Sequence, residues 1–172
     1  VSLLRARIFH RLAPWTTQPL IDQEIATATG LDELMAVSPQ AAANGIEMCH
    51  LFMHQLFTTV GDYIPRPDFF PKGEDDVKRL VEHFHRHKVK IVPYCAMTIA
   101  WQPFCGPQAS RVCREHENWQ YLGPGGVRYN CWSWGNMCYQ SGWGAYIKQK
   151  LDWLVCGLGF DGLHIDGPYH GL

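Results

Sequence analysis

The chain has 172 residues, of which 47% are hydrophobic, and a formal net charge of −1. This length and composition predict one globular domain with a substantial core and exclude a disordered chain. The small net charge argues against a nucleic-acid-binding protein, and no apolar run reaches the roughly 18 residues that a membrane-spanning helix needs. Val1 stands where Met would be expected and no signal-peptide pattern follows it, which suggests a processed form or a fragment.

The first half of the chain predicts two strands separated by a helix. Arg5–Leu12 is the first candidate strand. Asp22–Asn44 is Ala-rich with helical spacing of its apolar residues and stops at Asn44-Gly45, while Pro39 predicts either a kink or the start of a second short helix. Ile46–His54 is a nearly continuous apolar run, so it predicts a strand buried on both faces.

The second half repeats this alternation. Glu74–His87 has apolar residues at helical spacing, acids in its first turn and bases in its last, which suits the helix dipole. Lys90–Met97 predicts a third strand and Gln140–Leu158 a third helix. The fourth strand lies between Gly162 and Gly167-Pro168 and ends on Asp166.

Strands that alternate with helices through short helix-to-strand turns predict a parallel α/β sheet. An open doubly wound sheet and part of a (β/α)8 TIM barrel are the alternatives. No glycine-rich fingerprint follows the first strand, which disfavours a dinucleotide site. The long loops 55–73 and 98–139 both follow the carboxyl end of a strand, where a barrel builds its active site. We therefore predict a single domain over residues 1–172 that forms a partial TIM barrel of about four parallel strands.

The seven cysteines include no C-x-x-C pair, so a zinc ribbon or a thioredoxin-type site has no support. Cys49, Cys95 and Cys156 lie in apolar segments and are predicted to be core residues. The other four cysteines lie in the loop-rich middle of the chain, where one disulfide is an alternative; they are Cys105, Cys113, Cys131 and Cys138.

Several segments together resemble the (β/α)8 glycoside hydrolases, particularly α-galactosidase-like and α-amylase-like barrels. Asp68–Gly73, a helix and then His87–Tyr94 look like their step from second to third strand. Glu115–Trp119 and Gly123–Gly126 resemble their third loop, and Met137-Cys138, a helix and Gly159–Asp166 resemble the approach to their fourth strand.

The resemblance implies that Asp166 holds the fourth-strand position of the catalytic nucleophile in retaining members. It also implies that the acid/base lies on a later strand, absent from this chain, which would be the N-terminal half of a catalytic domain. The residue type fits that role, because glycoside hydrolysis needs two carboxylates. The alternative is that Asp166 caps the turn at Gly167-Pro168. Asp161, before the strand, is predicted to be a turn residue at the opposite end of the sheet.

Other polar side chains are predicted around Asp166. His164 lies two residues before it and so shares its face of the strand, either as a sugar ligand or as a hydrogen-bonded core histidine. His10, His50 and Tyr94 fall near the ends of the first three strands. They could line the same pocket, or bind a metal, although no tight metal-ligand spacing supports that. His83, His85 and His87 are predicted to be surface residues of a helix.

The loops supply candidate sugar contacts. Aromatic rings can pack on the apolar faces of sugars, which favours Trp101, Trp132 and Trp134 among the many loop aromatics. Asp62 and Arg66 in the second loop are candidates for binding hydroxyl groups, or are otherwise solvated or locally paired.

The leading hypothesis is a carbohydrate-active hydrolase that cleaves O-glycosidic bonds in an oligo- or polysaccharide without a cofactor or metal. A non-catalytic carbohydrate-binding or degenerate barrel and a metal-dependent barrel hydrolase are the alternatives. Unpaired edges at the first and fourth strands also predict self-association.

Overall fold

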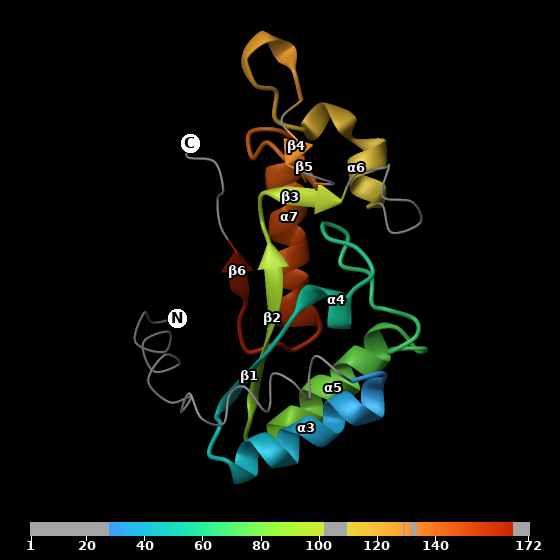
Figure 1. Cartoon of the computed structure of the whole chain (residues 1–172), viewed down its shortest axis with the longest axis vertical. Coiled ribbons are helices and arrows are strands. Elements are labelled where there is room, and N and C mark those ends of the chain that lie inside the picture. The colour runs from blue at the N-terminus through green and yellow to red at the C-terminus, as the bar shows by residue number, and fades with distance from the viewer. Residues whose placement is uncertain (1–27, 102–109, 129, 132–133, 167–172) are drawn as a thin grey trace.

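A computed structural model describes residues 28–101, 110–128, 130–131 and 134–166 (Figure 1). The predicted strand Arg5–Leu12 lies outside these residues. None of the helices in the described part of the chain has the length and apolar character that crossing a bilayer would require.

A parallel sheet forms the centre of the structure. Its strands are β1 (Met48–Leu51), β2 (Lys90–Ala96) and β6 (His164–Asp166), in the order β1-β2-β6. The predicted α/β class with parallel strands is therefore confirmed. Within the described residues there are three parallel strands and no closed barrel, in place of the four strands expected from the sequence.

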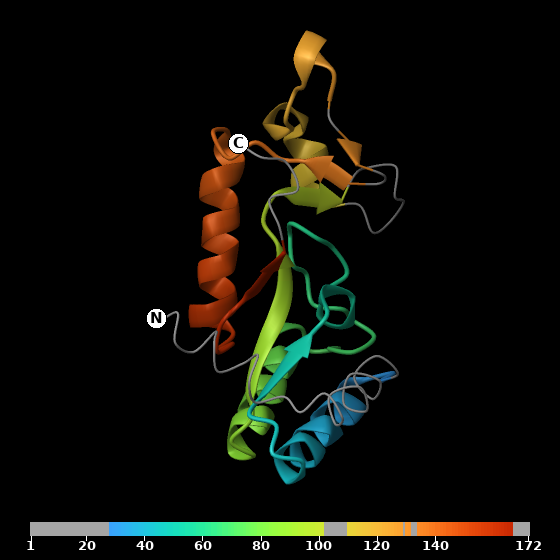
Figure 2. The ribbon, with the colours of Figure 1, turned by 60° about the vertical axis from the view of Figure 1, so that its left-hand side comes forward.

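Three long helices cover this sheet near the positions that the sequence predicts. They are α3 (Leu31–Ala43), α5 (Glu74–Arg86) and α7 (Gly142–Asp152). The helix α3 runs through Pro39 as one element and ends before Asn44-Gly45, where Gly45 has the positive φ of 72° that glycine tolerates. In both views α7 runs alongside the parallel sheet, and α3 packs against α5 (Figures 1 and 2).

One face of the parallel sheet carries the core. Cys49 and Leu51 of β1 and Ile91 and Cys95 of β2 are buried in one apolar cluster with residues of all three helices. On α5 the buried positions include those predicted from helical spacing, namely Val77, Leu80, Val81 and Phe84. The alternation of buried and half-buried residues along β1 shows that this strand is not buried on both faces, so that prediction is wrong.

The end of α7 departs from regular helix. A π-helical turn, Trp153–Gly157, follows Asp152 and leads to Gly159, whose φ is 87°. A π turn holds more residues than an α turn and so shifts which side chains face inward. Cys156 is exposed there, whereas the apolar sequence predicted a core position; Cys49 and Cys95 are buried as predicted.

The loop 98–139 contains an antiparallel sheet that the sequence did not reveal. Its strands, in the order β3-β5-β4, are β3 (Ile99–Trp101), β5 (Trp134–Asn136) and β4 (Asn130–Cys131). Strands of two or three residues are too short to show an alternating pattern. Figure 1 shows this sheet beyond the carboxyl end of β2.

Short helical segments complete the two loops that follow β1 and β2. They are α4 (Met53–Leu56), α6 (Arg111–Glu115) and the 3-10 turns η2 (Glu117–Trp119) and η3 (Pro124–Gly126).

Candidate functional site

The face of the parallel sheet opposite the core carries a cluster of four rings: His50, Phe52, Tyr94 and His164. We call it the histidine–aromatic cluster. Phe52 stacks on Tyr94 with ring centroids 4.5 Å apart and planes 18° apart. His164 lies edge-on to Tyr94 at 5.1 Å. The cluster forms because residues two apart in a strand face the same way, so His50 and Phe52 face the side opposite Cys49 and Leu51.

The two histidines of the cluster meet above the middle strand. His50 is opposite Val92 in the register of β1 with β2, and His164 is opposite Tyr94 in the register of β2 with β6. Strands two places apart in a sheet are separated by roughly 9.5 Å. Nevertheless, Nε2 of His50 lies 3.1 Å from Nδ1 of His164, so both side chains lean over β2 and share one hydrogen bond.

Burial controls the protonation of His50. Burial first, and the neighbouring His164 imidazole second, together lower the pKa of His50 from 6.5 to about 4. His50 is therefore neutral at physiological pH. A neutral imidazole has one N–H and one acceptor nitrogen, so one histidine donates the shared proton and the other accepts it.

Asp166 is the last residue of β6 and pairs in register with Ala96, the last residue of β2. Since the strands are parallel, their carboxyl ends lie at the same edge of the sheet. Asp166 thus occupies, by its backbone, the edge where α/β enzymes place their active sites. Its role as nucleophile stays a prediction.

Asp161 lies at the opposite end of this strand pair, as the sequence predicted. One of its carboxylate oxygens, Oδ2, accepts hydrogen bonds from the backbone N–H of Ile91 at 2.9 Å and from Nε2 of His85 at 2.8 Å. These contacts join the start of β6 to the start of β2 and to α5. The contacts of Asp161 and His85 are therefore structural.

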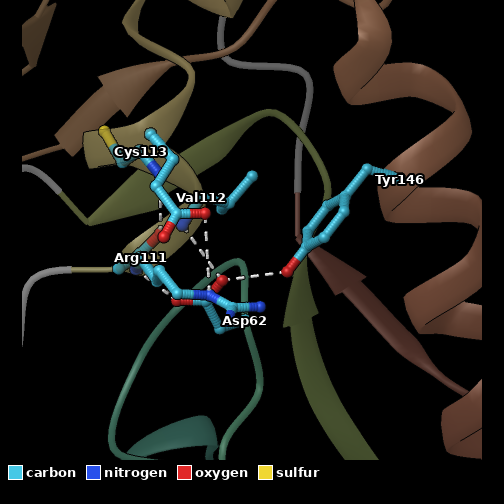
Figure 3. Close-up of polar contacts among 7 residues, drawn as sticks. Asp62, Arg111, Val112, Cys113 and Tyr146 are labelled. Carbon is cyan, nitrogen blue, oxygen red and sulfur yellow. Dashed lines mark hydrogen bonds and ion pairs between the residues drawn. The ribbon is translucent and has the colours of Figure 1, made fainter.

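Asp62 is buried at 4% exposure and ties its own loop to two helices, α6 and α7 (Figure 3). Its carboxylate accepts the backbone N–H groups of Arg111 and Val112, at 2.5 and 3.2 Å, at the start of α6. It also accepts the hydroxyl of Tyr146 in α7 at 2.9 Å. Both carboxylate oxygens of Asp62 thus accept hydrogen bonds from the protein itself. Its contact with a sugar hydroxyl stays a prediction.

Arg66 is locally paired, which is one of the alternatives that the sequence left open. Its guanidinium forms an ion pair with Asp68 and lies over the ring of Phe69, 4.1 Å from the centroid.

The predicted tryptophans lie on the antiparallel sheet or outside the described residues. Trp101 of β3 and Trp134 of β5 are direct partners in the antiparallel register, so their backbones adjoin. Trp132 and His10 lie outside the described residues. Among the side chains that the structure describes, no group of three or more His, Cys, Asp or Glu gathers as a metal site.

Two residues of this region were missed from the sequence. Phe52 belongs to the cluster, and the two-residue period that linked His164 to Asp166 would have placed it beside His50. Tyr63 is fully buried and bonds the carboxyl end of β2, and nothing in the local sequence signals that contact.

A cleft of about 450 Å³ lies away from the cluster, between the loop at 62–65, Glu74 and α7. Its walls include Tyr146 and Trp153, and the amine of Lys150 lies 5.7 and 5.4 Å from the centroids of those two rings. Because Lys150 already covers both rings, we place the candidate site at the sheet and not in this cleft.

Neither the known protein families nor the curated protein sequences contain a match to this chain. Several solved structures do match its fold. An α-galactosidase from Thermus thermophilus, in complex with p-nitrophenyl α-D-galactopyranoside, superposes with a TM-score of 0.64 at 17% identity, over 80% of this chain and 27% of that one. The GH36 α-galactosidase AgaA from Geobacillus stearothermophilus, in a variant complexed with raffinose, gives 0.63 at 15% identity, over 78% and 18%.

A maltogenic α-amylase, AmyB from Thermotoga neapolitana, gives a TM-score of 0.64 at 13% identity, over 85% of this chain and 37% of that one. The chain therefore spans between about a fifth and somewhat over a third of these structures. At such identities the likeness is one of fold, and it confirms the resemblance to part of a glycoside hydrolase that the sequence motifs predicted.

Proposed function

We propose that the chain is the N-terminal half of a (β/α)8 catalytic domain and supplies one wall of the active site of a carbohydrate hydrolase. Asp166 would be the nucleophile, and the acid/base would come from a strand other than the three parallel strands that the structure describes. One observation carries the proposal: β6 ends on Asp166 beside the end of β2, in a sheet whose fold matches part of several glycosidases.

The histidine–aromatic cluster supports a saccharide as the substrate class. It offers stacked rings together with imidazole nitrogens, the combination that binds apolar sugar faces and hydroxyl groups. His164 and Tyr94 are opposite each other, two residues before Asp166 and Ala96 on the same two strands, so a sugar at the strand ends would lie against them. The α-galactosidase neighbours are complexed with galactosides in their structures, which favours glycosides as first substrates to test.

The test compares two carboxylate substitutions in the intact barrel that contains this chain. Asp166→Asn should preserve the melting temperature and lower turnover of p-nitrophenyl glycosides by about a thousandfold or more, because an amide cannot attack the anomeric carbon. Asp161→Asn is the matched control, since Asp161 lies at the opposite end of β6. It should lower the melting temperature and leave turnover nearly unchanged.

Normal turnover in Asp166→Asn together with a lowered melting temperature would sink the assignment and make Asp166 a turn cap. Saccharide binding without any turnover in the parent protein would favour the non-catalytic carbohydrate-binding barrel instead.

A further inference from the structure

The geometry of the His50–His164 pair points to a further site. We propose that these two imidazoles bind one divalent transition-metal ion, such as Zn²⁺, between Nε2 of His50 and Nδ1 of His164. The proposal goes beyond the glycosidase assignment and rests on the geometry of the pair alone.

The two nitrogens already lie at nearly the right separation. Ligand nitrogens bind Zn²⁺ at about 2.0–2.1 Å, and two of them at a tetrahedral angle are about 3.3–3.4 Å apart. The observed distance between the His50 and His164 nitrogens is 3.1 Å. The ring centroids are 4.4 Å apart with planes 48° apart, so the His164 ring must rotate and shift outward for both lone pairs to point at the ion, and His164 is exposed enough to do so.

Protons balance without a co-reactant. In the free pair, one ring carries its proton on the nitrogen that faces the other ring. When the ion binds, that ring takes its other tautomer, with the proton on its far nitrogen, so both facing nitrogens present lone pairs to the metal. Both rings stay neutral, as metal-bound imidazoles are.

The ligand type and the strand setting define the chemistry of the ion. Imidazole suits Zn²⁺, Ni²⁺ and Cu²⁺, whereas Mg²⁺ and Ca²⁺ prefer oxygen ligands. The two histidines come from β1 and β6, on either side of β2, so their backbones are fixed by the sheet. With two protein ligands, the remaining positions of the ion are open to water or an added ligand.

A second histidine pair sets the control. His83 in the last turn of α5 and His87, which follows the helix as its C-cap, have ring centroids 4.7 Å apart. Both Nδ1 atoms contact the buried hydroxyl of Ser38, at 2.9 and 3.0 Å. Their outer nitrogens could also hold an ion. Zn²⁺ binding is therefore measured in the 172-residue chain carrying His83→Gln and His87→Gln, by competition with a chromophoric chelator near pH 7.5.

In that background, His50→Gln and His164→Gln should each weaken Zn²⁺ binding by at least about tenfold, since losing even an outer partner of a ligand costs 10- to 100-fold. Excess Mg²⁺ should not displace the Zn²⁺. Unchanged Zn²⁺ affinity in both variants would overturn the proposal. Should His50→Gln fail to fold, imidazole NMR signals of the unsubstituted chain decide: Zn²⁺ must shift those of His50 and His164, and unshifted signals overturn it. No glycoside is used, so the outcome is independent of the proposed hydrolase activity.

Discussion

The hydroxyl of Tyr63 bonds both backbone groups of Ala96. It donates to the carbonyl oxygen at 2.8 Å and accepts the N–H at 3.1 Å. Ala96 is the residue that pairs with Asp166, while β1 pairs with β2 only as far as Leu51 opposite Pro93. The Tyr63 hydroxyl therefore makes the hydrogen bonds to Ala96 that a further residue of β1 would otherwise make. It holds the end of β2, and the position of Asp166 depends on that strand end.

Replacing Tyr63 by Phe tests whether the hydroxyl holds the end of β2. The change leaves the buried N–H and C=O of Ala96 without partners, which should lower the free energy of unfolding by about 1–3 kcal/mol. Amide exchange at Ala96 should accelerate more than elsewhere in β2. Tyr121→Phe, at a side chain that is 50% exposed, is the control and should change neither quantity. Unchanged exchange at Ala96 would show that the phenol does not hold the strand end.

The carboxylate of Asp62 should matter more for stability than any single donor to it. Asp62→Asn removes the charge that three donors share and turns an N–H group toward backbone N–H groups, so we expect a loss of about 1–3 kcal/mol in urea denaturation. Tyr146→Phe removes one of those three bonds and should cost about 0.5–1.5 kcal/mol. An equal or larger loss in Tyr146→Phe would contradict this ranking.

Stability should fall with decreasing pH because of His50. Its pKa is lowered from 6.5 to about 4 in the folded chain, mainly by burial. Between these values the unfolded chain binds a proton that the folded chain does not, so the free energy of unfolding falls as the pH drops from about 6.5 to 4. Because the ring is partly exposed, we expect about 1 kcal/mol from this residue.

The contribution of His50 is measured as the difference in this pH dependence between the parent and His50→Gln. Burial of His83 also lowers its pKa and adds to the same pH range, which the difference removes. His164→Gln should keep most of the effect, since burial outweighs the neighbouring imidazole at His50. Identical pH profiles in the parent and His50→Gln would refute the prediction.

The chain on its own should self-associate. In the described part of the parallel sheet, β1 and β6 are the outer strands, and Phe52 and Ile165 are 40% and 44% exposed. Unpaired edges with exposed apolar residues pair readily with other chains. Phe52→Ser should shift size-exclusion profiles toward monomer, whereas Val127→Ser, at a residue 68% exposed beyond the antiparallel sheet, should not. A clean monomer with a cooperative melt in the parent would contradict this.

Elements with a strong local signal could be predicted from the sequence. The observed α5 begins at the expected Glu74 and ends at Arg86, one residue before the prediction, because acids, apolar spacing and terminal bases all mark the same segment. The core helices and the parallel strands follow from the same kind of signal. The end of α7 could not be predicted in this way, because an apolar run gives no signal that separates a π turn from an α turn. The π turn leaves Cys156 exposed.

The candidate site was predictable only where strand period and strand ends decide it. The two-residue period of a strand places His50, Tyr94 and His164 together on one face, and the end of the strand pattern places Asp166 at the strand end. Neither rule predicts contacts between distant segments. The bonds of Asp62 to α6 and α7 and of Tyr63 to Ala96 depend on the path of whole loops through space, which no local pattern encodes.

The excursion that leaves β2 and returns before α7 is closed at its base. The N–H of Met137 donates to the carbonyl of Thr98 at 2.8 Å, so the two ends of the segment are tied together where it leaves the central sheet. Insertions or deletions at its exposed outer turn, Pro124–Gly126, can accumulate without moving β2 or α7, whereas the start of α6 is held by Asp62. The outer turn is thus the part that evolution, or an engineer, can vary while the framework beneath it stays the same.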